Sequence, residues 1–182
     1  MILLVLENKL HLTNPADLAR AEECISKQNA VELFETGHLD ELNPGTVEAL
    51  AEIHRCLFSE IYAFAGKIRT VNLAKGNFRF APVLYLEAAL TAIEAMPQST
   101  FDEIIEKYVE MNIAHPFREG NGRSSRIWLD LMLKKELGQV VDWTRVDQED
   151  YLLAMERSPI KDLEIKQLLA AALTGEVNSR TV

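Results

Sequence analysis

The sequence of 182 residues has little cysteine, glycine or proline and no long apolar run. Two cysteines are too few for a disulfide scaffold, and eight glycines with six prolines exclude collagen-like and low-complexity chains. The apolar run at the start, Met1 to Leu6, ends at Glu7 and is too short to cross a bilayer. It also lacks the positive leader and the cleavage site of a secretory signal. We therefore expect a soluble, cytoplasmic protein without a membrane partner.

Positive charge is scarce as well. Nineteen Lys and Arg stand against 28 Asp and Glu, which gives a formal net charge of −9. Such a molecule repels phosphate polymers, so we expect no direct nucleic-acid partner. Cys24 and Cys56 lie in apolar-periodic stretches without the spacing of metal ligands. We expect both to be reduced core thiols rather than metal or redox residues.

Helical signals recur along the chain, and 48% hydrophobic residues suffice for the core of one domain. The expected helices are one capped by Asn14-Pro15, with Gly37 closing a second short stretch; one from Asn43-Pro44 to Gly66; Leu84 to Met96; one from the capping box at Thr100 to about Ala114; one begun by Ile127 and stopped at Gly138; one capped by Asp147; and one from Ser158-Pro159 to Gly175.

The segment from Ile68 to Pro82 has a different pattern. Residues that favour strands flank Lys75-Gly76-Asn77, which predicts a short hairpin as the one sheet of the protein. The expected fold class is therefore all-α, a single helical domain with one small β-hairpin.

Reactive and phosphate-binding residue types are concentrated in one string, HPFREGNGRSSR, from His115 to Arg126. Gly120 and Gly122 bracket Asn121 just before a predicted helix. The free N–H groups of a helix N-terminus, with glycines that allow close approach and positive φ, form an anion site. Arg123 and Arg126 are three residues apart and share a helix face. Two arginine forks beside free N–H groups suit a polyphosphate.

Two further residues of the string fit a metal-bridged nucleotide. A carboxylate at Glu119, beside a polyphosphate, needs Mg²⁺ between the two. His115 precedes Pro116, which places it at a helix exit, and an imidazole with a pKa of about 6.5 can accept a proton from an attacking hydroxyl. Phe117 is expected to pack beneath the loop.

Each of these features alone has an ordinary structural reading. A lone histidine is usually a capping residue, Gly-Asn-Gly is usually a turn, and paired arginines usually form a solvated face. The combination is what carries the prediction, because eight specified residues would assemble by chance on the order of once in a hundred million chains of this length.

The string resembles the signature of the Fic family, HPFx[DE]GNGRxxR, and matches it at every specified position. The resemblance implies a helical fold that transfers AMP from ATP to a protein hydroxyl and releases pyrophosphate. His115 would be the base and Glu119 the Mg²⁺ ligand. The implied phosphate-binding residues are Gly120, Asn121, Gly122, Arg123, Ser124 and Arg126, with Asn121 at the α-phosphate and the two arginines at the β- and γ-phosphates.

The resemblance extends beyond the string. Phe64 to Arg69 is similar to the family's approach to the active-site flap, and Lys75 to Pro82 is similar to the flap, on which a target protein docks by strand pairing. Lys75 and Phe78 are candidate flap contacts, or else a solvated turn with a buried Phe. Weaker candidates for nucleotide contacts are Asn112, Gln148 and Tyr151. We treat residues 1–182 as one Fic domain with its core from about Asn29 to Leu173.

Two departures from family patterns bear on activity and regulation. Kinase relatives of the Doc type have lysine where this chain has Gly122, which favours adenylyl transfer. The inhibitory motif [ST]xxxE[AG]xxN is not found, so we expect either a chain truncated after residue 182 or an antitoxin-like partner, as for a toxin-like bacterial enzyme.

The resemblance also suggests self-modification, self-association, and a target such as a type II topoisomerase subunit. The alternatives are transfer of UMP, GMP or phosphocholine on the same fold, and a non-enzymatic nucleotide- or peptide-binding module.

Overall fold

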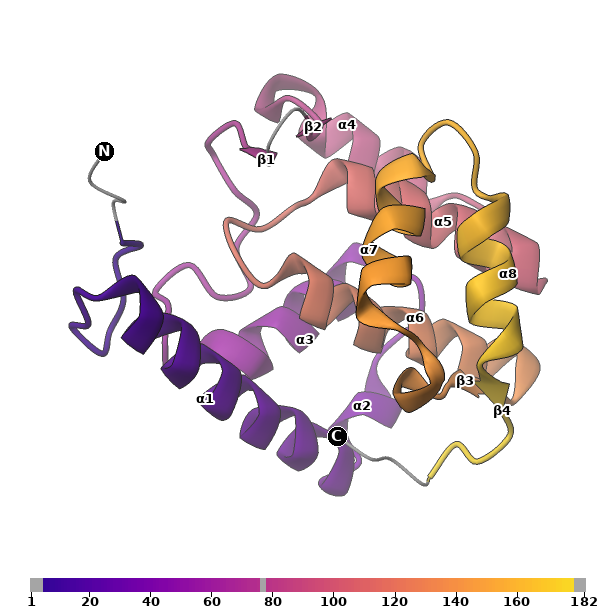
Figure 1. Ribbon diagram of the computed structural model, residues 1–182, viewed down its shortest axis with the longest axis horizontal. Helices are drawn as coiled ribbons and strands as arrows, with labels where there is room; N and C mark the ends of the chain where they lie inside the picture. The colour runs from indigo at the N-terminus through magenta and orange to yellow at the C-terminus, as the bar shows by residue number, and fades with distance from the viewer. Residues whose placement is uncertain (1–4, 76–77, 179–182) are drawn as a thin grey trace.

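The computed structural model describes residues 5–75 and 78–178, without the side chains of Lys75 and Phe78. Within these residues the chain is mostly helical, as predicted (Figure 1). The helices are α1 (Pro15–Glu35), α2 (His38–Glu41), α3 (Val47–Phe58), α4 (Val83–Glu94), α5 (Phe101–Ala114), α6 (Asn121–Leu137), α7 (Gln148–Arg157) and α8 (Leu163–Ala171), with a 3-10 helix, η1 (Trp143–Arg145). None of the described helices combines the length and apolarity that a membrane crossing needs.

Two small antiparallel sheets accompany the helices in the described residues. β1 (Ala74–Lys75) pairs with β2 (Phe78–Arg79), which confirms the predicted hairpin. β3 (Val140–Val141) pairs with β4 (Leu173–Thr174). This second sheet was not predicted, because strands of two residues are too short to show an alternating pattern.

Several helix ends follow the predicted capping residues. The Asn14 side chain accepts a hydrogen bond from Ala16 N–H at 2.8 Å, and Asp147 accepts from Glu149 N–H at 2.9 Å. At α5, Thr100 Oγ1 accepts from Glu103 N–H, and the Glu103 carboxylate accepts from Thr100 N–H at 3.0 Å. This capping box satisfies two donors that the helix itself leaves unpaired.

Other predicted boundaries were wrong. Residues 15–35 form one helix, because nothing after Pro15 in that run breaks it, and Gly37 instead starts α2 with φ 75°. Helix α3 is capped by Thr46 rather than Asn43 and ends at Phe58, well before Gly66.

Toward the C-terminus, α6 begins at Asn121, inside the reactive string, and not at Ile127. Ser158-Pro159 lies in a turn before α8, and Gly175 follows strand β4. Cys24 is exposed on α1, so the prediction that both cysteines lie in the core was wrong for Cys24.

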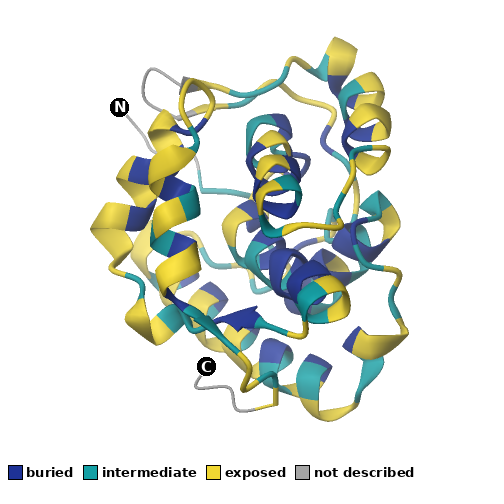
Figure 2. Ribbon diagram, turned by 90° about the vertical axis from the view of Figure 1, so that its right-hand side faces the viewer, coloured by how far each residue is buried: buried dark blue, intermediate teal, exposed yellow. Residues whose placement is uncertain are grey.

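The core surrounds α6, against which α3 and α5 both pack, while α1 packs on α3. Figure 2 shows buried residues on the inward faces of these helices and exposed residues on their outer faces. The side chains at the centre have no exposed surface: Ile53, Phe58, Ile104, Tyr108, Trp128 and Met132. The packed core includes Leu18 of α1. This packing fixes the loop between α5 and α6, which carries the reactive string.

Candidate active site

His115 lies where α5 ends. It has φ 49°, in the left-handed region, and its N–H donates to Met111 O at 3.0 Å. Its ring is half-buried and stacks on Phe80, with the ring centroids 3.6 Å apart. Phe80 directly follows strand β2 of the hairpin, so the imidazole contacts the base of the predicted flap.

Arg69 joins this helix end to the flap. Arg69 is 3% exposed, and its guanidinium donates to four backbone carbonyls. These acceptors are His115 O (2.7 Å), Ala114 O (3.0 Å), Ala81 O (2.6 Å) and Val71 O (2.8 Å). Burial lowers the pKa of Arg69. One buried cation therefore fixes the histidine, the segment that leads into the flap and the C-terminal end of the flap relative to each other.

The N-terminus of α6 has the geometry predicted for an anion site. Gly120, its N-cap, has φ 80°, and a Cβ there would lie 2.4 Å from the buried ring of Phe58. The position therefore requires glycine. The first helical bond runs from Ser124 N–H to Gly120 O at 3.2 Å, so the N–H groups before it have no carbonyl partner within the helix. Gly122, in contrast, is helical. Of the two glycines, Gly120 has the predicted positive φ and Gly122 does not.

Two polar residues of the string shape this turn. The Asn121 amide accepts from Phe117 N–H at 2.8 Å and donates to Phe117 O at 2.7 Å. Ser124 has no exposed surface, and its hydroxyl donates to Gly120 O at 2.9 Å. Both side chains therefore hold the loop in place. Their direct contacts with phosphate stay predictions, and the burial of Ser124 argues against one through its hydroxyl.

Glu119 is exposed at the same turn, and its carboxylate accepts from Gly120 N–H at 2.9 Å. A buried histidine on α3, His54, holds the backbone of this turn: His54 Nε2 lies 2.8 Å from Glu119 O, and His54 Nδ1 accepts from Gly66 N–H at 2.9 Å. The ring stacks on Phe117, with centroids 3.8 Å apart, which confirms that Phe117 packs beneath the loop. Burial lowers the pKa of His54 to about 4, so His54 is neutral at pH 7.

The two arginines of the string point to different neighbours. Arg123 forms an ion pair with Glu22 of α1, donates to Ser26 Oγ at 3.0 Å, and lies 4.9 Å from the centre of the Phe58 ring. Arg126 lies 5.6 Å from the centre of a ring of Trp143. Both nevertheless line one cavity of about 650 Å³ between α1, α6 and the β3 region. The prediction that both arginines lie on one face of the helix is therefore confirmed, although they contact different residues.

The weaker candidates lie around this centre. Asn112 is half-buried on α5, and Gln148 is exposed at the first residue of α7. Tyr151 is buried, with its hydroxyl bonded to that of Tyr108. A nucleotide contact stays a prediction for all three. The side chains of Lys75 and Phe78 lie outside the described residues, although their backbones pair in the hairpin.

Sequence reasoning missed the residues that hold the string in place. His54, Glu22 and Ser26 were not singled out, and Arg69 was noted only within a stretch similar to the approach to the flap. All four contact the string from 46 to 101 residues away in the sequence. Each is a polar residue in an otherwise apolar-periodic segment or beside a glycine turn. This polar position is the one sequence signal that could have identified these residues as contacts of the string.

The comparisons with known proteins agree with this geometry. The model of the Fic/DOC family matches residues 44–133. The protein adenylyltransferase VbhT of Bartonella schoenbuchensis is 31% identical over 159 residues, or 80% of this chain, and the match spans about a third of that longer protein (32%). The probable protein adenylyltransferase y4lH of Sinorhizobium fredii is 29% identical over 171 residues, covering 87% of this chain and 85% of its own length.

Solved structures show the same fold. The N-terminal FIC domain of Bep8 from Bartonella sp. 1-1C has a TM-score of 0.80 and 16% identity, covering 97% of this chain and 94% of that one. The N-terminal Fic domain of a putative cell filamentation protein from Bartonella quintana, solved with bound ADP, has a TM-score of 0.78 and 21% identity, covering 93% and 91%. The complete string on a matching fold, the family model and the relatives lead to one conclusion: the chain belongs to the Fic/DOC family.

Proposed function

We propose that the protein is an adenylyltransferase that transfers AMP from ATP to a hydroxyl group of a protein and releases pyrophosphate. The observation that carries the proposal is the juxtaposition of His115, at the end of α5, with the open N-terminus of α6 across a loop of five residues, 116–120. One element offers a base and the other an anion site. The names of relatives such as VbhT, a protein adenylyltransferase, support the choice of reaction.

The residues divide the reaction between them. The N–H groups at the start of α6 and the guanidinium groups of Arg123 and Arg126 would bind the phosphates. His115 would accept the proton as the hydroxyl oxygen bonds to the α-phosphorus. The bond between the α-phosphorus and the bridging oxygen then breaks, and pyrophosphate leaves with its negative charge compensated by the arginines. Gly122 leaves room for the β- and γ-phosphates, which is the reason to favour adenylyl over phosphoryl transfer.

Magnesium is part of the proposal. Glu119 fits it, because its carboxylate is exposed beside the α6 N-terminus and supplies an oxygen of the kind that Mg²⁺ prefers. Mg²⁺ bound there would neutralise phosphate charge. ATP is the proposed donor and the cytoplasm the proposed compartment, since ATP is available there.

The target protein is proposed to dock on the flap, residues 75–82. β1 and β2 pair over two residues each, and an incoming extended segment could add to their open edge through backbone hydrogen bonds. Recognition through the backbone would suit several targets, including another copy of this chain or a topoisomerase subunit. We also propose that the cavity lined by Arg123 and Arg126 receives an inhibitory helix, supplied by an antitoxin-like partner or by further chain.

Labelled ATP tests the reaction. The chain is incubated with Mg²⁺ and ATP labelled at the α- or the γ-phosphate, alone and with bacterial lysate, and the proteins are separated. We expect transfer of the α-label only. Transfer of the γ-label would show phosphoryl transfer. If neither label is transferred, with or without lysate, the enzyme proposal is contradicted. The same incubation is repeated with labelled UTP, GTP, CTP and a phosphocholine donor, and the amount of label transferred from each tests the alternative donors.

Matched histidine variants complete the test. His115→Ala should abolish labelling while ATP binding is largely kept, and His11→Asn, at an exposed loop position, should label like the wild type. The non-enzymatic alternative predicts instead that His115→Ala keeps any cellular effect of the protein. Sedimentation of the same samples tests self-association, which stays a prediction.

A further inference from the structure

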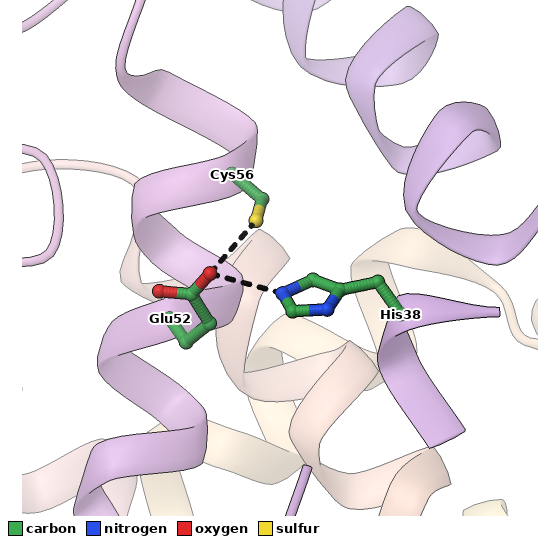
Figure 3. Close-up of side chains that lie close together, drawn as sticks. All are labelled: His38, Glu52 and Cys56. Atoms are coloured by element: carbon green, nitrogen blue, oxygen red, sulfur yellow. Dashed lines mark hydrogen bonds and ion pairs between the residues drawn. The ribbon is translucent and has the colours of Figure 1, made fainter. Parts of the chain in front are cut away.

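Three half-buried side chains of metal-binding type meet between α2 and α3 (Figure 3). His38 begins α2, while Glu52 and Cys56 belong to α3. Glu52 Oε1 lies 3.0 Å from His38 Nε2 and 3.6 Å from Cys56 Sγ, and one ligand atom from each residue lies within 4.8 Å of the other two. We propose that His38, Glu52 and Cys56 bind a zinc ion.

The spacing of the ligand atoms fits a tetrahedral ion. With metal–ligand bonds of about 2.0–2.3 Å, ligand atoms around zinc lie roughly 3.3–3.8 Å apart. The two separations from Glu52, 3.0 and 3.6 Å, lie close to this range, and the third is below 4.8 Å, so small side-chain rotations bring the three atoms onto one ion. Glu52 and Cys56 are four residues apart and so share a face of α3. The turn at Gly37, with φ 75°, brings His38 to that face, which explains why no sequence spacing revealed the group.

A fourth residue orients the imidazole. Glu41 Oε2 lies 3.0 Å from His38 Nδ1, on the ring edge opposite the cluster. A carboxylate that holds one ring nitrogen of a histidine while the other faces the metal is the usual second partner of zinc-binding histidines. It directs Nε2 toward Glu52 and Cys56. This arrangement distinguishes the group from a chance meeting of polar side chains.

The composition of the group selects the metal. Thiolate and imidazole ligands favour zinc over magnesium and calcium, which prefer oxygen. The cavity beside Cys56, of about 330 Å³, is also lined by Glu32 and Glu60, together with the positively charged Arg55. A water molecule from this cavity can complete the four-coordinate shell.

Two features oppose binding and set its strength. The guanidinium of Arg55 forms an ion pair with Glu52, with Arg55 Nε 2.7 Å from Oε2, and the metal must compete with it. The Arg55 side chain is 57% exposed and can turn into solvent. Burial, followed by the negative charge of Glu52, raises the pKa of Cys56 to about 11, so zinc binding must also displace the thiol proton. We therefore expect a moderate affinity.

Cobalt is the probe, because tetrahedral Co²⁺ bound to a thiolate gives a near-ultraviolet charge-transfer band and visible bands that zinc does not. The reduced, metal-free chain is titrated with CoCl₂, and zinc is then added. We expect both bands to saturate at one Co²⁺ per chain and to disappear on addition of one equivalent of Zn²⁺. Zinc should also raise the thermal unfolding midpoint by a few degrees.

Matched variants identify the ligands. Cys56→Ser should remove the charge-transfer band, and Cys24→Ser, on exposed α1, should keep it. His38→Gln, a change at a half-exposed position that should leave the fold intact, should weaken Co²⁺ binding at least tenfold, and Glu41→Gln should weaken it about tenfold. Glu119→Gln should leave the bands unchanged, because Glu119 lies outside this cluster, at the proposed magnesium site. No thiolate band in the wild type, a band that survives Cys56→Ser, or one lost in Cys24→Ser would overturn the proposal.

Discussion

The carboxylate of Glu22 on α1 pairs with the guanidinium of Arg123 on α6, and the same carboxylate accepts the hydroxyl of Tyr62. Glu22 is 8% exposed, so both bonds lie largely out of water. Burial, followed by the bond to Glu22, raises the pKa of Tyr62, which therefore stays protonated and keeps donating. An arginine proposed to bind phosphate thus has its charge compensated by the protein before any nucleotide arrives.

Replacing Glu22 by glutamine tests this compensation. Glu22→Gln keeps a hydrogen-bonding group of the same size but removes the negative charge, so Arg123 should attract the triphosphate more strongly. We expect Mg²⁺-ATP to bind roughly fivefold tighter, as about 1 kcal/mol of competing ion pairing disappears. Isothermal titration of the His115→Ala background, which should not turn ATP over, measures the affinity.

The neighbouring residue supplies the control. Glu23 lines the same cavity but pairs with Lys27 in solvent, at 2.8 Å. Glu23→Gln should change ATP affinity by less than Glu22→Gln does. Unchanged ATP binding in Glu22→Gln would show that the ion pair does not compete with phosphate. Weaker binding would show that the pair positions Arg123 for phosphate.

Arg69 offers a prediction about positioning. Arg69→Lys retains a positive charge, but one ammonium group cannot reach the four carbonyls that the guanidinium fork binds. We expect a loss of about 2–4 kcal/mol in the free energy of unfolding, because buried carbonyls lose their donors. The labelling rate of the folded fraction should also fall at least tenfold, since a small displacement of His115 misaligns the base.

Urea unfolding and single-turnover labelling at saturating ATP separate these two effects. Arg118→Lys is the matched control, because Arg118 is exposed and lies over Phe64 without the carbonyl network. The positioning role would be contradicted if labelling by Arg69→Lys declined only in proportion to its unfolded fraction.

The reactive loop could be predicted because its chemistry is contiguous in the chain. His115 and Gly120 lie five residues apart, and a helix exit followed by a helix entry can be recognised from Pro116 and the glycines. The capping box at Thr100 was equally local. By contrast, the bond from His54 to Glu119 spans 65 residues, and the pair of Glu22 with Arg123 spans 101. Such contacts depend on how α1 and α3 pack, which periodicity does not specify.

The same limit explains the errors. A helix face was correctly assigned to Arg123 and Arg126, but which neighbour each one meets depends on α1 and Trp143. Cys24 belongs to an apolar-periodic stretch but lies off the buried face of α1, because a surface helix buries only one face. Local patterns gave element types, while tertiary packing decided partners and exposure.

Acid should destabilise the protein through His54. Its folded pKa is about 4, below its ordinary value of 6.5, because the buried ring is costly to charge. As the pH falls below about 6.5 the unfolded chain binds the proton first, so the stabilisation is complete above that pH and is lost between about 6.5 and 4. We expect the free energy of unfolding to fall by about 2 kcal/mol from pH 7 to pH 5 through this group.

Urea unfolding at both pH values, with EDTA present, measures the effect. His54→Asn should be less stable at pH 7 and should lose much less on acidification, while His11→Asn should behave like the wild type. An equal acid-induced loss in His54→Asn and the wild type would show that another group is responsible.

The two glycines of the string should respond oppositely to alanine. In Gly120→Ala, a left-handed φ of 80° and a Cβ 2.4 Å from Phe58 Cε2 both oppose the methyl group. We expect a loss of about 2–4 kcal/mol in the free energy of unfolding. Gly122 is helical, and its Cβ would meet Arg126 Nη1 at an ordinary 3.6 Å. Gly122→Ala should therefore be as stable as the wild type or up to about 1 kcal/mol more stable.

Thermal unfolding and α-label transfer are measured together on both variants. A destabilised Gly122→Ala, or a Gly120→Ala variant of wild-type stability, would contradict the opening of α6 described here. The stable Gly122→Ala protein is also informative about chemistry, because its added methyl group lies at the exposed start of α6, where the phosphates are proposed to bind. A fall in labelling by that folded variant would report on the space available to the phosphates, since neither the fold nor any hydrogen-bonding group has been removed.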